Sequence, residues 1–104
     1  MKQEDEIRLL KELAGIVGSQ IELVRHDSTA GLEEMVGHSG QLARKIAVAG
    51  LLDRPQYDGW RERLAGLYGE LQLMLSTQKD AVAGQLKLIN KGRKTLAMYR
   101  DSNF

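Results

Sequence analysis

The chain has no cysteine and a single proline among its 104 residues. Without cysteine it can form neither a disulfide framework nor a thiolate metal site, which fits a reducing compartment such as the cytoplasm. Proline interrupts the interior of a helix, so its scarcity leaves long stretches of the sequence free to be helical. The one proline, Pro55, is therefore expected at a boundary between two helices.

Aromatic residues and long hydrophobic runs are also scarce. Aromatic residues make up 5% of the chain and hydrophobic residues 42%, so the core must consist mainly of Leu, Ile, Val and Ala, as in helices packed on helices. No apolar run approaches the roughly 18–20 residues that span a bilayer. The acidic start, MKQEDEIR, is unlike a secretory signal. We expect one soluble, cytoplasmic domain spanning residues 1–104, with no membrane contact.

The formal net charge is only +1, which argues against a general nucleic-acid-binding protein. The charge is unevenly distributed, because basic residues outnumber acidic ones from Leu86 onward. The one acidic residue there is Asp101, whereas the basic residues are Lys87, Lys91, Arg93, Lys94 and Arg100. Basic side chains near a helix C-terminus are favoured by the helix dipole. An acidic partner surface is a second explanation and a nucleic acid a third. Of these, we expect no nucleic-acid partner.

Hydrophobic periodicity predicts a helix over about residues 3–26 and a second over about 29–52. Asp27 or Ser28 is the expected N-cap of the second helix, since both side chains can accept from free backbone N–H groups. The expected inner face of the first helix is Ile7, Leu10, Ala14, Val17, Ile21 and Val24. That of the second is Leu32, Met35, Val36, Leu42, Ala43, Ile46 and Ala49.

The third periodic stretch is the longest and runs over about residues 55–100. Unbroken, it would form a helix of about 46 residues and about 70 Å. Its apolar stripe comprises Trp60, Leu64, Leu67, Leu71, Leu75, Val82, Leu86, Ile89 and Leu96. The sequence therefore predicts an all-α, antiparallel bundle of three helices with a very long third helix. A bend near Ser76 and Thr77, turning the far half into a fourth helix, is the alternative, because both are poor interior residues.

Each expected helix carries one pair of glycines spaced three residues apart. The pairs are Gly15/Gly18, Gly37/Gly40 and Gly66/Gly69. All lie far from the apolar stripe of their helix, so they are not core residues. Three interpretations are open: surface glycines without a role, a second surface that another backbone approaches closely, and a bundle softened so that it can deform on binding.

Catalytic and metal-binding patterns are absent from the sequence. His26 and His38 are the only histidines. Glu34 and His38 share a helix face, but metal-binding bundles use Glu-x-x-His with further glutamates opposite, so a surface ion pair is expected. The run Gly92-Arg93-Lys94-Thr95 lacks the first half of a phosphate-binding loop. We therefore expect no enzymatic activity, no catalytic residue, no cofactor and no metal.

The far half of the third helix is the candidate binding surface. The two preceding helices are too short to cover it, and it carries Val82, Leu86, Ile89, Leu96 and Tyr99 on its main stripe. A second copy of the chain could cover this stripe in a homodimer, and so could an amphipathic helix of another protein. The first possibility would make the protein a homo-oligomeric scaffold or regulatory adaptor.

The C-terminal part of the sequence follows the spacing L-x-x-I-x-x-G-R-x-x-L-x-x-Y, with Leu86, Ile89, Gly92, Arg93, Leu96 and Tyr99 at the named positions. The acidic first helix is followed by Leu32-Glu33-Glu34-Met35-Val36 and Leu42-Ala43-Arg44-Lys45-Ile46. With these features the sequence resembles the FlgN/FliT-type flagellar export chaperones of type III secretion, and the second pair of motifs is similar to the residue spacing of the FlgN members. The resemblance covers nearly the whole chain.

This resemblance implies a cytosolic chaperone that keeps a late flagellar subunit unpolymerised and delivers it for export. The client would be a hook–filament junction protein for FlgN-like members or the filament cap protein for FliT-like members, and FliT-like members also contact the export ATPase. Carried onto this chain, the partner-binding residues are Leu86, Ile89, Leu96 and Tyr99, with Arg93 as a rim contact.

Overall fold

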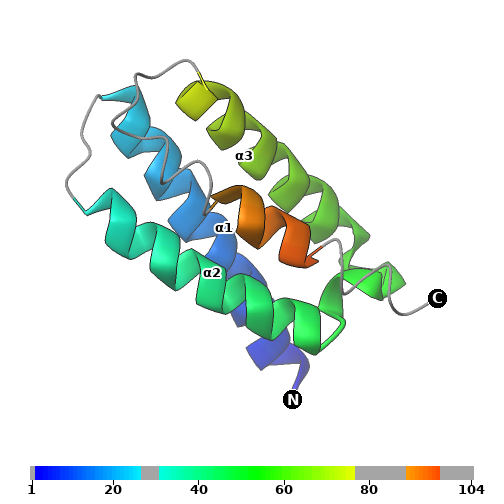
Figure 1. Ribbon diagram of the computed structural model, residues 1–104. Helices are drawn as coiled ribbons and strands as arrows, with labels where there is room; N and C mark the ends of the chain where they lie inside the picture. Colours follow the sequence, from blue (N-terminus) through cyan, green and yellow to red (C-terminus); the bar gives the residue numbers. More distant parts are fainter. Residues whose placement is uncertain (1, 27–30, 77–88, 97–104) are drawn as a thin grey trace.

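The computed structural model describes residues 2–26, 31–76 and 89–96, and these residues are helical apart from the connecting turns (Figure 1). The elements are α1 (Gln3–Arg25), α2 (Leu32–Val48), two 3-10 turns, η1 (Leu51–Asp53) and η2 (Pro55–Tyr57), and α3 (Asp58–Ser76). Residues 89–96 form a further helical segment. The predicted all-α class is therefore confirmed for the described part of the chain.

Helix α1 lies beside both α2 and α3 (Figure 1). The side chain of Gln20 in α1 donates to the Met35 carbonyl of α2 at 3.2 Å, while the start of α1 meets the end of α2 through Arg54. The late part of α1 therefore lies beside the start of α2, so the two helices run antiparallel. Arg25, at the end of α1, reaches Glu70 near the end of α3, so α1 and α3 run in the same direction.

Hydrophobic stripes at helical spacing build the core. Most residues of the two predicted inner faces are buried, although Ile7, Met35 and Ala49 are only half-buried. The fully covered side chains include Leu10, Leu13, Val17, Leu32, Ile46, Leu51, Leu64 and Leu71. Burying a side chain of this size contributes about 1.5–3 kcal/mol, so these residues dominate the packing energy.

Two left-handed glycines set the bounds of α2, which is shorter than the predicted 29–52. Gly31, with φ of 78°, precedes the helix as its N-cap, so the expected caps Asp27 and Ser28, which lie outside the described residues, do not hold that position. Gly50, with φ of 65°, follows the helix, and its N–H donates to the Ala47 carbonyl at 3.0 Å. Glycine reaches this backbone region without steric cost, and it ends the helical path here.

Pro55 lies at a helix boundary, as predicted. Arg54, the residue before it, is extended (φ −84°, ψ 129°), because the proline ring disfavours helical geometry at the preceding position. Pro55 opens the short turn η2 rather than α3 itself, and α3 begins at Asp58. Asp58 then pairs with Arg61 one turn later, at 2.8 Å.

The prediction of one unbroken third helix over residues 55–100 is wrong. Arg93 donates a hydrogen bond to the side chain of Gln72, 21 residues earlier in the chain. Residues that far apart in a straight helix are separated by about 31 Å, so the chain has reversed direction before residue 89. The alternative of a fourth, returning helix agrees with these contacts; the expected hinge residue Thr77 lies outside the described part.

Candidate interaction surface

Residues 89–96 lie along α3, with their charged face outward and Ile89 turned into the core. Ile89 is 2% exposed and belongs to the hydrophobic cluster formed by α1, α2 and α3. The amide of Gln72 joins the segment to α3, because its nitrogen donates to Asn90 and its oxygen accepts from Arg93. Apart from Ile89 and Gly92, no residue of this segment is fully buried.

Tertiary contacts hold residues 89–96 against the rest of the protein. Ile89 is buried in the hydrophobic cluster, the half-buried Leu96 packs against it, and the Gln72 amide bonds to Asn90 and Arg93.

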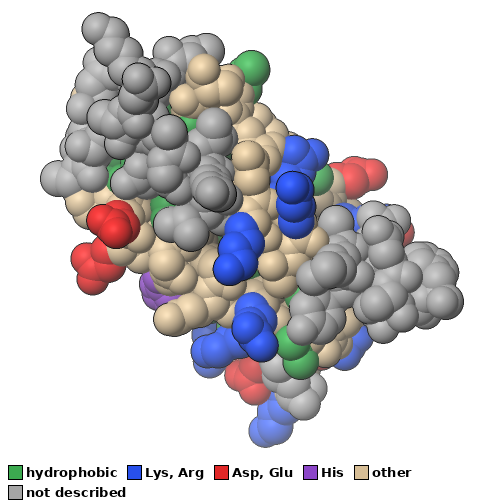
Figure 2. All heavy atoms as spheres, viewed as in Figure 1, with side chains coloured by type: hydrophobic (Ala, Val, Ile, Leu, Met, Phe, Trp, Pro, Cys, Tyr) green, Lys and Arg blue, Asp and Glu red, His purple; other side chains and the backbone are tan. Residues whose placement is uncertain are grey.

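The outer face of the segment is basic. Lys91, Arg93 and Lys94 are all exposed, and 89–96 contains no acidic residue. Figure 2 shows Lys and Arg side chains gathered near the middle of this face, where Figure 1 places the segment, while acidic side chains lie toward its edges. This surface would attract an acidic partner through a field that added salt would screen.

The structure places three of the five predicted partner-binding residues in this segment. Arg93 is exposed, Leu96 is half-buried and Ile89 is buried. The expectation that the described part of this stripe is uncovered was wrong, since the chain covers Ile89 with its own helices. Leu86 and Tyr99, as well as Val82, lie outside the described residues.

Trp60, predicted to be a core residue, lies at the core's edge. It is half-buried and packs against the hydrophobic cluster from the first turn of α3. The guanidinium of Arg63 lies 5.3 Å from the centre of its ring, a cation–π contact. The described core face of α3 instead includes Tyr68, which is 2% exposed and was not predicted from the sequence.

A second unpredicted feature is a set of buried polar side chains at the start of α1. Glu6 is only 4% exposed, yet it accepts a hydrogen bond from the Tyr57 hydroxyl at 2.9 Å and pairs with Arg54. Burial raises the pKa of Glu6, but these two donors lower it further, and the net pKa lies below its usual value. The contacts attach α1 to the α2–α3 connection, and they are structural.

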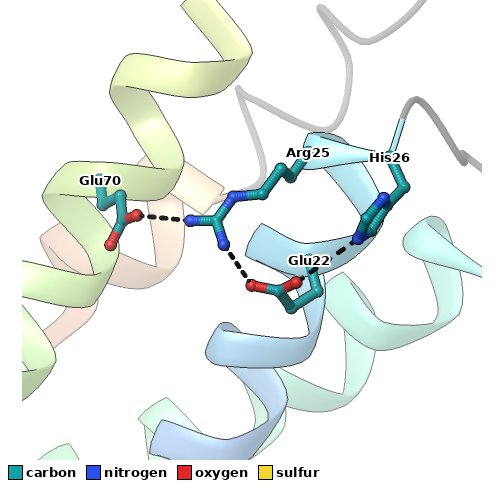
Figure 3. A network of polar contacts seen from close by, with 4 residues as sticks. All are labelled: Glu22, Arg25, His26 and Glu70. Atoms are coloured by element: carbon teal, nitrogen blue, oxygen red, sulfur yellow. Dashed lines mark hydrogen bonds and ion pairs between the residues drawn. The ribbon is translucent and has the colours of Figure 1, made fainter.

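Within the described ranges, neither histidine belongs to a cluster of possible metal ligands. His26 caps α1, and its Nε2 lies 3.7 Å from Glu22, which also pairs with Arg25 at 2.7 Å; Figure 3 shows how Arg25 continues this network to Glu70 on α3. The expected pair between Glu34 and His38 is not formed. Among the described residues, no group of three or more His, Asp or Glu side chains could hold a metal ion.

Comparison with known proteins identifies no relative. No family model, no curated protein and no solved structure matches the chain. Within the described ranges, none of the helices combines the length and apolar character needed to cross a bilayer.

Proposed function

We propose that the protein is a cytosolic, non-enzymatic chaperone that forms an antiparallel helical bundle and binds an amphipathic helix of a late flagellar subunit before export. The sequence resemblance suggests the client class, and the arrangement of residues 89–96 supports helix binding. A helix-in-groove mode uses an apolar seam with a charged rim, which Ile89 and Leu96 beside the exposed Lys91, Arg93 and Lys94 would supply once a client replaces their contacts with the core.

The observation that carries the proposal is the position of Ile89. The segment that carries three expected client contacts, residues 89–96, itself lies on the core, held by one buried aliphatic side chain and the Gln72 amide. A client helix binds by taking over these contacts. Part of its intrinsic binding energy is then used to displace the segment, so the complex stays reversible, as export requires.

The charge of the segment indicates what the client helix should carry. Lys91, Arg93 and Lys94 form a basic rim next to the apolar seam. A client helix with acidic residues beside its leucine face would complement this rim, and its association rate would fall with added salt.

The decisive experiment is co-expression of the tagged protein with individual late flagellar subunits, followed by size-exclusion chromatography with light scattering. We expect a stable 1:1 complex with one subunit. Leu96→Ala combined with Tyr99→Ala should abolish it. Charge reversal to Glu at Lys91, Arg93 and Lys94 should weaken it by tenfold or more.

The matched control is Arg8→Glu on α1, where a 75% exposed side chain lies 3.6 Å from Asp5, its one ion-pair partner among the described residues. This variant should bind the client normally. A protein that forms dimers without any subunit, and whose dimers are broken by the Leu96/Tyr99 substitutions, would contradict the chaperone proposal and favour the homo-oligomeric scaffold. Loss of binding in Arg8→Glu as well would remove the assignment of the site to the C-terminal segment.

A further inference from the structure

A cavity of about 230 Å³ lies between α3, the turn η1 and residues 89–96. An apolar cavity of about 150 Å³ is enough to hold benzene, so this one has room for about nine non-hydrogen atoms. Four apolar side chains line most of it: Leu52, Leu64, Ala65 and Leu96. The other lining residues are two arginines, Arg61 and Arg93, and one tyrosine.

The arginines make the cavity electropositive. Arg61 donates to the Asp58 carboxylate at 2.8 Å and to the Leu52 carbonyl at 3.4 Å, while Arg93 donates to the side chain of Gln72. A guanidinium carries five N–H donors, so both arginines retain unused ones. Two guanidiniums and one neighbouring carboxylate leave a net positive charge at the rim.

The tyrosine is Tyr68, whose hydroxyl is buried and has no hydrogen-bond partner among the residues that the structure describes. Burial raises the pKa of Tyr68 to about 12, so the hydroxyl keeps its proton at neutral pH and is available as a donor. Gly92 approaches it from the C-terminal segment: a Cβ at that position would lie 3.8 Å from the hydroxyl oxygen. A buried donor without an acceptor is unfavourable, and native proteins rarely keep one.

We propose that this cavity binds a small amphipathic carboxylate. Its apolar body, of about six or seven carbon atoms, packs among the four apolar side chains. Its carboxylate is bound by Arg61 and Arg93, whose planar guanidiniums suit a carboxylate, and Tyr68 gains the acceptor that it lacks. Carboxylate binding does not require the proposed chaperone function to be correct, but the two sites share Arg93 and Leu96.

The test uses octanoate as the probe and the full chain, with isothermal titration calorimetry. We expect saturable 1:1 binding. Octan-1-ol has the same chain without the carboxylate and should bind at least tenfold more weakly. Arg61→Gln and Arg93→Gln should each weaken octanoate binding about tenfold or more, since charge-assisted hydrogen bonds are lost. Arg63→Gln, which removes a guanidinium outside the cavity lining, should leave the affinity unchanged.

Tyr68→Phe separates a binding role from a structural one. In the free protein the substitution removes an unpaired buried hydroxyl, so the melting temperature should rise. In the same variant the affinity for octanoate should fall about threefold to tenfold. Unchanged affinity in Tyr68→Phe, equal binding of octanoate and octan-1-ol, full affinity in both arginine variants, or no saturable binding by the unsubstituted protein would each overturn the proposal.

Discussion

The glycine pair on α3 offers a quantitative test of the structure. Gly66 and Gly69 lie in the interior of a 19-residue helix, and a Cβ built on either would meet no heavy atom within 4 Å. Replacing each by alanine therefore costs no packing and removes the conformational penalty of glycine in a helix, about 0.8–1.0 kcal/mol per residue. We expect Gly66→Ala with Gly69→Ala to stabilise the protein by about 2 kcal/mol.

Thermal unfolding followed by circular dichroism at 222 nm measures this gain. Unfolding entropy is about 2.1 cal/mol/K per residue, so for a chain of this length about 2 kcal/mol corresponds to a rise of about 9 °C in melting temperature. The matched control is Gly50→Ala, where φ is 65°. An L-residue pays roughly 1–2 kcal/mol for this left-handed conformation, so that variant should melt several degrees lower.

An unchanged or lowered melting temperature in the double variant would refute the reasoning, because it would mean that the two positions are in close contact with another backbone. Measuring at two protein concentrations shows whether that contact comes from a second copy. The same variant also tests the two functional interpretations of the glycine pairs. If it binds the client with unchanged affinity, Gly66 and Gly69 neither contact a partner backbone nor soften the bundle in a way that binding requires.

Two further predictions concern the core and its buried acid. Leu71→Ala, at a fully buried position, should lower the free energy of unfolding, measured in urea, by about 2–5 kcal/mol. Leu73→Ala is the control: its side chain is 69% exposed, so the free energy should change by less than about 0.5 kcal/mol. Similar losses in the two variants would contradict the orientation of α3 described above. Because the pKa of Glu6 is lowered in the folded state, its stabilisation is present above its usual pKa of 4.5 and is lost as the pH falls through the lower, folded value. Between pH 6 and pH 3, the free energy of unfolding measured in urea should therefore fall less in Glu6→Gln than in the unsubstituted protein. An identical pH dependence in both proteins would show that Arg54 and Tyr57 do not favour the ionised carboxyl.

The periodic stripes of α1 and α2 could be predicted from the sequence because their apolar residues recur on one face whichever partner they pack against. Val17 and Ile46, for example, were expected inside and are fully covered. The helix boundary at Pro55 follows from local backbone sterics, so it too needed no knowledge of the fold. The positions of the glycine pairs away from the core follow from the same periodicity.

The buried polar residues could not be predicted in this way. Glu6 and Gln20 belong to residue types that are mostly exposed. Gln20 is nevertheless fully covered, and it donates to Ser39 of α2 at 3.1 Å. The partners that make such burial tolerable lie 19 and 51 residues away in sequence for Gln20–Ser39 and Glu6–Tyr57, so only the packed structure brings them together.

The course of the chain after α3 was likewise decided by tertiary structure. An apolar stripe repeats with the same period in one long helix and in two helices that fold back on each other, so Leu71, Leu75 and Ile89 fit both arrangements. The sequence by itself determined that these residues lie on the inner face of a helix. Only the packing of Ile89 into a core that α1, α2 and α3 already share decided that the chain returns and provides its own cover.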